Sequence, residues 1–177
     1  MAISKNSQAY VQTQQNLQGI TRGLVVVVDP SIGSSSSMPG WAVYREGHYV
    51  ASGIFEINPT KPKPERLRSL GRQLLALYQK YPPDVLVYEE IPAQRHGFGN
   101  AEAHASLLKS LGVVLSVPGP AGYVGIAPIS WKNQVRESYV KSDENDAVEM
   151  GWIIIELAQV ILLDTDKKTK GKKNGKK

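Results

Sequence analysis

The sequence predicts an α/β domain in which helices flank a mixed five-stranded sheet, and three observations lead to this fold class. A continuous apolar run at residues 24–29 ends in an acid, and a second such run does so at residues 84–90. Between them, residues 65–80 carry leucines at helical spacing. Strand, helix and strand in this order imply a right-handed crossover and a parallel pairing of the two buried strands.

The first run opens a three-stranded meander. Residues 24–29 are mostly valine, which predicts a strand buried on both faces. Two further strands are expected at 41–44 and 49–57, joined as a hairpin through Glu46 and Gly47. Together with the strand at 84–90, these segments supply four of the five strands.

The second half of the chain adds one strand and three helices. We expect a helix at residues 101–115 and a strand at 123–129. Ser130 is a suitable N-cap for a short helix to Tyr139, and Ser142 is one for a long helix to Leu163.

The length of 177 residues suits one domain. We expect a flexible polar arm at residues 1–22, a folded domain at 23–163 and a disordered lysine-rich tail at 164–177. The chain has no cysteine, which excludes disulfides, thiolate zinc sites and a cysteine nucleophile. A metal site would have to consist mainly of oxygen ligands.

The formal net charge of +5 is concentrated near the C-terminus. Residues 167–177 hold seven lysines and no acid, and the rest of the chain has 14 basic and 16 acidic side chains, a net charge of −2. We find neither a run of about 18 apolar residues nor the order of a secretory signal. We therefore expect a cytoplasmic protein, in the nucleoid or the cytoplasm of a host, without a membrane partner; organelle import is the alternative for its acid-poor start.

Several carboxylates stand at the ends of predicted elements. Asp29 ends the first strand and Glu89 or Glu90 ends the strand at 84–90, while Asp143 and Asp146 begin the last helix. Parallel neighbouring strands would bring their terminal acids within reach of one another, and two such acids repel unless a cation lies between them. Residues three apart on a helix share a face, so both helical acids can reach the same cation.

This set of oxygen ligands suits a hard cation such as Mg²⁺. Two such ions can hold a scissile phosphate and activate a water, which is the chemistry of phosphodiester hydrolysis. Each acid alone has an ordinary structural explanation, as a loop cap or as a partner of the helix dipole. Their joint occurrence in this order of elements is instead typical of a ribonuclease-H-like plan.

Over nearly all of residues 23–163, the sequence resembles the RuvC family of Holliday-junction resolvases. In that family a hydrophobic strand ends in Asp-Pro-Gly, an acid follows four apolar residues in the fourth strand, and two acids separated by two residues precede an alanine. The matching segments are the strand ending in Asp29 and Pro30, the strand ending in Glu89, Glu90 and Ile91, the helix at 106–113, and the helix start from Asp143 to Val148. The resemblance selects Glu89 over Glu90 and implies that Asp29, Glu89, Asp143 and Asp146 are catalytic and bind metal.

The resemblance further implies a homodimer that binds four-way DNA junctions and nicks two opposing strands symmetrically, with Mg²⁺ or Mn²⁺. Ser31 replaces the usual glycine, the serine-rich loop after Asp29 is longer, and the segment between Lys132 and Asp143 is short. These departures concern junction preference more than cleavage, and they would suit a phage enzyme or another divergent member. The loop at 33–37 lacks the Gly-Lys-Ser/Thr ending of a P-loop, so no nucleotide cofactor is expected.

Candidate DNA contacts occur in three places. The loop after the strand at 84–90 holds Arg95, His96 and Phe98, and Phe98 either stacks on an opened base pair or packs under its own loop. At a predicted helix start, Lys132 either meets a phosphate or is solvated. The tail lysines would attract DNA electrostatically; they include Lys167, Lys168, Lys170, Lys172 and Lys173.

We therefore expect a metal-dependent, structure-selective endonuclease that acts on branched DNA. The alternatives are a nuclease of the same fold that acts on RNA and a non-catalytic junction-binding protein. The helix at 101–115 has apolar residues on more than one side, which predicts a two-fold dimer contact.

Overall fold

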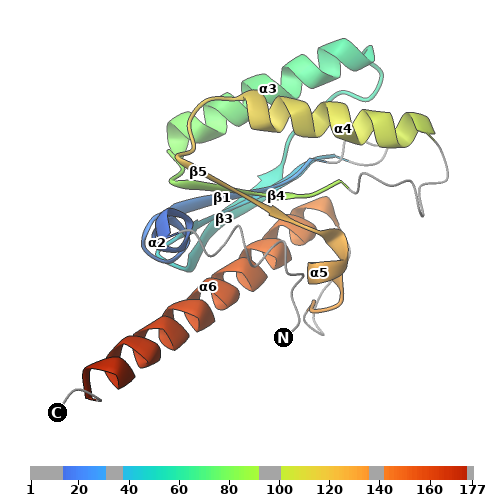
Figure 1. Ribbon diagram of the computed structural model, residues 1–177. Helices are drawn as coiled ribbons and strands as arrows, with labels where there is room; N and C mark the ends of the chain where they lie inside the picture. Colours follow the sequence, from blue (N-terminus) through green and yellow to red (C-terminus); the bar gives the residue numbers. More distant parts are fainter. Residues whose placement is uncertain (1–13, 31–37, 92–100, 136–141, 175–177) are drawn as a thin grey trace.

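The computed structural model describes residues 14–30, 38–91, 101–135 and 142–174, and within these ranges the side chains of residues 14, 15, 143 and 164–174 are not described. Five strands form one sheet in the order β3-β2-β1-β4-β5, with helices on both faces (Figure 1). The strands are β1 (Leu24–Asp29), β2 (Gly40–Arg45), β3 (His48–Ile54), β4 (Val85–Glu89) and β5 (Gly122–Ile126). The helices are α2 (Gln14–Arg22), α3 (Lys63–Lys80), α4 (Ala101–Ser116), α5 (Pro128–Lys132) and α6 (Asp143–Asn174). This confirms the predicted fold class.

The sheet is mixed, as the order of elements predicts. β2 pairs antiparallel with both β1 and β3, whereas β1, β4 and β5 run parallel. The hairpin turn is the predicted one: Glu46 and Gly47 have φ angles of 53° and 78°, and positive φ at both central positions matches the twist of the flanking strands.

Each face of the sheet has its own core. Val25 and Val27 of β1 belong to a cluster that includes apolar residues of α2 and α6. Val26 and Val28 belong to a second cluster, with residues of α3 and α4. Because successive side chains of a strand point to opposite faces, odd-numbered residues of β1 face α6 and even-numbered ones face α3 and α4.

The N-terminal arm was expected to be flexible up to residue 22, but the structure contains α2 from Gln14. Leu17 and Ile20 of α2 are buried in the α6-side cluster. They lie three residues apart on one side of the helix, so their burial against the sheet stabilises the helix. The polar composition of the segment does not predict this helix.

The last helix is longer than expected. We predicted an end at Leu163 and a disordered tail at 164–177, whereas α6 continues to Asn174. Residues 164–174 contain no proline, and lysines near a helix C-terminus interact favourably with the helix dipole. The predicted cap is confirmed, since the Asn145 backbone N–H donates to Ser142 Oγ at 3.1 Å.

The short helix α5 also differs from its prediction. It begins at Pro128 with Ala127 as N-cap, so Ser130 lies inside it, and it ends at Lys132 instead of near Tyr139. Proline is well suited to the first position of a helix because that position needs no N–H donor. Lys132 is therefore at the end of this helix and not at its start.

Within the described ranges, we find no helix with the length and hydropathy needed to span a membrane.

Candidate active site at the carboxyl edge of the sheet

The acids that end β1 and β4 lie next to each other on the same face of the sheet. The parallel ladder pairs Val28 with Tyr88, so Asp29 and Glu89 follow on adjacent strands. Both have odd numbers, like Val27 and Val87 of the α6-side cluster, and strand alternation therefore places both carboxylates toward α6. Asp29 is buried, with 3% of its surface exposed.

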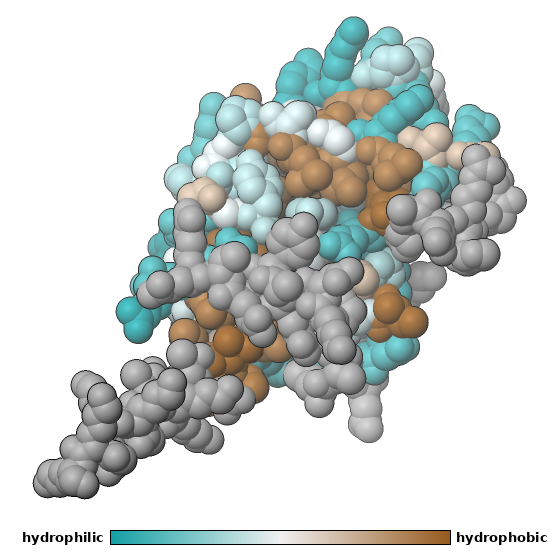
Figure 2. All heavy atoms as spheres, in the orientation of Figure 1, coloured by the Kyte–Doolittle hydropathy of each residue, from teal (hydrophilic) through white to brown (hydrophobic). Residues whose placement is uncertain are grey.

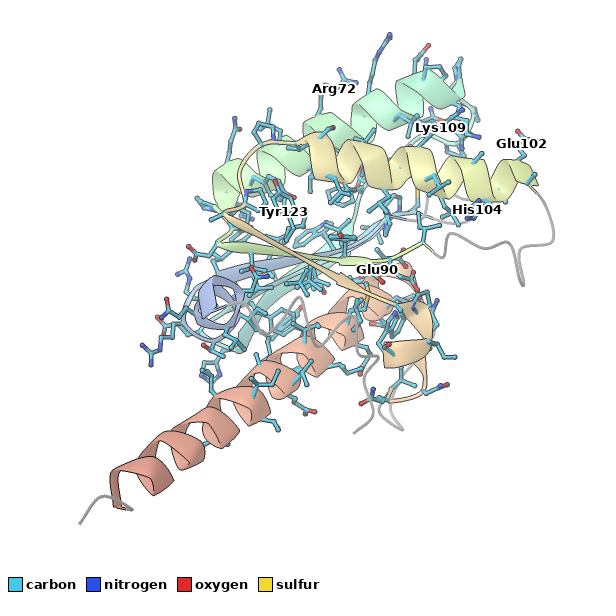
Figure 3. All side chains as sticks on the ribbon, in the orientation of Figure 1. Arg72, Glu90, Glu102, His104, Lys109 and Tyr123 are labelled. Carbon is cyan, nitrogen blue, oxygen red and sulfur yellow. The ribbon has the colours of Figure 1, made fainter. Side chains whose placement is uncertain are left out.

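Glu90 belongs to the opposite face. A Cβ added to Gly125 would lie 2.5 Å from Glu90 Oε1, so this carboxylate occupies the space above a glycine of β5. The neighbours of that glycine, Val124 and Ile126, belong to the α6-side cluster, so Gly125 faces α3 and α4. Figure 3 shows Glu90 where β4 ends. The two adjacent glutamates are thus separated by the sheet.

The start of α6 adds two more acids on the Asp29 side. Asp143 is the first residue of the helix, and Asp146 is buried with 6% of its surface exposed. Ala147, the next residue, packs in the core cluster that holds Val27. The helix therefore brings its N-terminal turn, the positive end of its dipole, to the face that carries the strand-end acids.

Two long-range hydrogen bonds hold this turn against the sheet. The Tyr44 hydroxyl of β2 donates to the Val148 carbonyl at 2.7 Å. On β3, Ser52 Oγ donates to Glu144 Oε1 at 2.5 Å. Sequence reasoning missed both contacts, because nothing in the local sequence pairs a strand residue with a helix about 100 positions later.

Lys132 forms an ion pair with one of the predicted catalytic acids. Its Nζ lies 2.9 Å from Glu89 Oε1; the Glu89 side chain is 14% exposed and that of Lys132 is 49% exposed. The ammonium also lies 4.9 Å from the ring centroid of Trp131, which is fully buried and anchors α5. This position differs from the phosphate contact considered for Lys132, because the lysine here neutralises a carboxylate.

Comparison with known proteins gives a result only at the level of structure. No protein-family model matches the chain, and no curated protein matches it. T. thermophilus RuvC in complex with a Holliday junction substrate has a TM-score of 0.58 and 16% identity, over 78% of this chain and 95% of that one. A second Thermus thermophilus RuvC structure gives 0.55 and 15%, over 78% and 96% of the two chains.

A third solved structure extends the likeness to a eukaryotic protein. The yeast mitochondrial Holliday junction resolvase Ydc2 has a TM-score of 0.50 and 16% identity, over 88% of this chain and 90% of that one. This chain has the RuvC-like resolvase fold. At these identities the likeness concerns the fold, and the roles of individual residues in this RuvC-like domain rest on its own geometry.

The donor chemistry of the candidate site suits a hard cation. Its acids offer only oxygen ligands, which Mg²⁺ and Mn²⁺ accept. Among the side chains that the structure describes, no three acids or histidines gather closely enough to hold a metal ion. The side chain of Asp143 lies outside that description, so a complete set of ligands would require it.

Most of the predicted DNA contacts lie outside the described side chains. Arg95, His96 and Phe98 lie outside the described residues, in the segment that joins β4 to α4. The tail lysines lie on the last turns of α6, where only the backbone is described; these are Lys167, Lys168, Lys170, Lys172 and Lys173.

The Tyr78 phenol is a buried polar group that lies away from these acids. Burial raises the pKa of the Tyr78 phenol well above its ordinary value, and the nearby Tyr123 adds to the rise. The Tyr78 hydroxyl has no hydrogen-bond partner among the described residues, and its ring packs in the α3-side core. We assign no chemistry to it.

Proposed function

We propose that this protein is a metal-dependent endonuclease that resolves four-way junctions and other branched DNA by paired, symmetric nicks. The observation that carries the proposal is the placement of Asp29, Glu89 and the start of α6 at one edge and on one face of a RuvC-like sheet. A protein that only bound DNA would gain nothing from several carboxylates near a polyanion. With a cation between them, the same carboxylates become a hydrolytic site.

In this proposal, Asp29, Glu89, Asp143 and Asp146 hold Mg²⁺, for which Mn²⁺ can substitute. Bound there, the metal would supply an activated water and neutralise charge on the scissile phosphate. The sheet positions two of the ligands through the parallel pairing of β1 and β4, and the capped start of α6 positions the other two.

Lys132 has a role in the same proposal. Without metal, its ammonium neutralises Glu89 across 2.9 Å. Its side chain is half exposed on a short helix beside the site, so it is able to turn toward a DNA phosphate once Glu89 has another cation. The lysine would then compete with metal for Glu89 when DNA is absent and bind DNA when it is present.

Paired nicks require two active sites, and the outer surface of α4 fits a second copy of this chain. The inner side of α4 buries polar residues, His104, Ser106 and Ser110, while Leu108 and Leu115 are 46% and 38% exposed. The same exposed side also carries Ala101, Ala105 and Gly112, so apolar or small residues recur there at intervals of four and three, the spacing of a helix–helix seam. Figure 2 shows hydrophobic surface gathered along this helix.

The remaining DNA contacts in the proposal come from segments on either side of the site. In this proposal the loop with Arg95, His96 and Phe98, which follows Glu89 in the sequence, contacts the junction centre. The lysines from Lys167 to Lys173 supply an electrostatic, shape-independent attraction.

Incubation with labelled substrates tests the proposal. The substrates are a four-way junction, a fork, a duplex and an RNA hairpin, each with and without Mg²⁺. We expect symmetric cuts in the junction that require Mg²⁺, with little cutting of duplex or RNA. Preferential cutting of RNA, or tight junction binding without any cleavage in Mg²⁺ or Mn²⁺, would contradict it.

A further inference from the structure

A groove on the outer side of α3 gathers positive charge that the candidate active site does not use. Its volume is about 730 Å³, and it is lined by the connection from β3 to α3 and by α3 between Glu65 and Leu75. The lining has four basic side chains and two acidic ones, a net charge of +2; the basic ones are Lys61, Arg66, Arg68 and Arg72, and the acids are Glu56 and Glu65.

The arginines of this groove are not neutralised by the part of the protein that the structure describes. Lys61 lies 4.0 Å from Glu65, but Arg66, Arg68 and Arg72 form no ion pair with any described residue. The Nε of Arg66 is buried and has no hydrogen-bond partner among the described residues. A buried donor without an acceptor is destabilising, and an anion beside this guanidinium would supply the acceptor.

The lining favours phosphate over base recognition. No aromatic side chain occurs among the described residues around the groove, so bases have no stacking surface there. Arg68 and Arg72 are exposed and lie one turn apart, about 6 Å along the helix. Arg72 projects from α3 away from the sheet (Figure 3). Two guanidinium forks at this spacing can each bind a phosphate in a bidentate manner, without reading sequence.

The groove starts at the same edge of the sheet as the candidate active site. The strand register aligns Asp29 with Gly40 and Gly40 with Ile54, so Ile54 and Asp29 are two strand spacings apart, about 10 Å. Glu56, which lines the groove, follows Ile54 by two residues. The groove lies on the α3 face and the acids lie on the α6 face, so a DNA arm that crossed this edge from the site would run toward the groove.

We propose that this groove binds the phosphate backbone of a DNA arm outside the cleavage site. The inference rests on the proposed function, since DNA is the substrate there, and it adds a second, sequence-independent contact that lengthens the bound DNA. It assigns to α3 a binding role that is separate from cleavage.

Two matched double variants test the groove. Arg68→Gln/Arg72→Gln removes two exposed charges inside it, and Arg22→Gln/Arg45→Gln removes two exposed charges outside it. Binding is measured over a range of salt concentrations for junctions with long arms, junctions with short arms and plain duplex, after thermal unfolding has shown that both variants fold.

For long arms we expect the groove variant to bind roughly tenfold more weakly at about 0.1 M salt, with a log–log salt slope lower by about 1.8, because two phosphate contacts are lost. Short-armed junctions should be bound and cut as by the unaltered protein. The outside variant should match the unaltered protein on both substrates.

The possible failures are distinguishable. The two variants could show equal salt slopes on long-armed junctions while the unaltered protein cuts junctions normally. This result would contradict DNA binding by the groove and leave the proposed function intact. If the unaltered protein cuts no junction, the duplex series still tests the groove. Stabilisation by inorganic phosphate that only the groove variant loses, with unchanged DNA binding, would show a site for free phosphate and overturn the assignment to DNA.

Discussion

The two faces of the sheet are covered by helices in different ways. On one face, α6 starts with acids beside Asp29 and Glu89 and packs against the sheet through apolar residues and two hydrogen bonds. On the other face, α3 and α4 cover a second core but turn outward a basic groove and a leucine stripe, which is the exposed side of α4 with Leu108 and Leu115. Under the proposed function, this difference assigns cleavage to the α6 face, and contacts with a DNA arm and a second copy to the α3 and α4 face.

If this division is right, a change on one face should leave the property of the other face intact. Adjacent residues give the sharpest contrast, because strand alternation places Glu89 and Glu90 on different faces. The following predictions run from the largest expected effect to the smallest.

The acids of the α6 face should be required for cleavage alone. Asp29→Asn, Glu89→Gln or Asp146→Asn should each slow junction cutting at least a thousandfold, about 4 kcal/mol of transition-state stabilisation, because each removes a charge that a hard cation needs. Junction binding should stay equal or become tighter, since repulsion of phosphates decreases. Single-turnover cleavage and a gel-shift titration measure the two effects.

Glu90→Gln is the internal control for these variants, and it should cut junctions at a near-normal rate. An inactive Glu90→Gln with an active Glu89→Gln would mean that the faces of β4 are assigned the wrong way round.

The leucine stripe should control association and not chemistry within one copy. Leu108→Lys/Leu115→Lys should weaken self-association at least a hundredfold, because charges would then enter an apolar contact. Val160→Lys/Leu163→Lys is the matched control, since these α6 residues are 52% and 60% exposed and lie outside the stripe. Light scattering measures the mass of each variant in solution. Equal masses for the two variants would show that α4 is not the dimer interface.

Two helical glycines should respond oppositely to alanine. A Cβ on Gly151 of α6 would overlap the Tyr44 ring, whereas a Cβ on Gly112 of α4 would meet nothing within 4 Å. We expect Gly151→Ala to lower the free energy of unfolding by about 1–3 kcal/mol through overpacking, and Gly112→Ala to raise it by up to about 1 kcal/mol through helix propensity. Denaturant unfolding at low protein concentration measures both, and a stabilised Gly151→Ala would contradict the close packing of α6.

The smallest expected effect concerns Lys132. Without DNA, Lys132→Met should bind Mn²⁺ up to about fivefold more tightly, because a competing cation is lost from Glu89; half exposure limits the ion pair to about 0.5–1 kcal/mol. Lys132→Arg keeps the charge and should resemble the unaltered protein. Manganese titration followed by electron paramagnetic resonance measures the affinity, and weaker binding by Lys132→Met would show that the lysine supports the metal site.

The sequence was sufficient for the elements whose signals are local. A run of valines ending in Asp29 predicts a central strand, and parallel pairing with the strand ending in Glu89 follows from the helix between them. The Ser142 cap is also a local signal, since side chain and backbone lie three residues apart. These features were enough to predict which acids share an edge of the sheet.

Other features depend on contacts between distant segments, and the sequence alone could not predict them. The helix from Gln14 is stabilised by burial of Leu17 and Ile20 against a core that forms elsewhere. The ion pair of Lys132 with Glu89 joins residues 43 positions apart, and its geometry depends on where α5 ends. The helix and strand propensities of individual residues do not predict such contacts between distant segments.

The length of α6 has a geometric consequence. With 32 residues at 1.5 Å per residue, its axis spans about 48 Å, and it extends well past the sheet (Figure 1). One continuous helix thus sets both the separation and the rotational phase between the acids at its start and the lysines at its end. Inserting a single residue after Leu163 would advance the lysines by about 1.5 Å and rotate them by about 100° around the axis. The position of the lysines relative to the acids therefore depends on the exact number of residues in the helix.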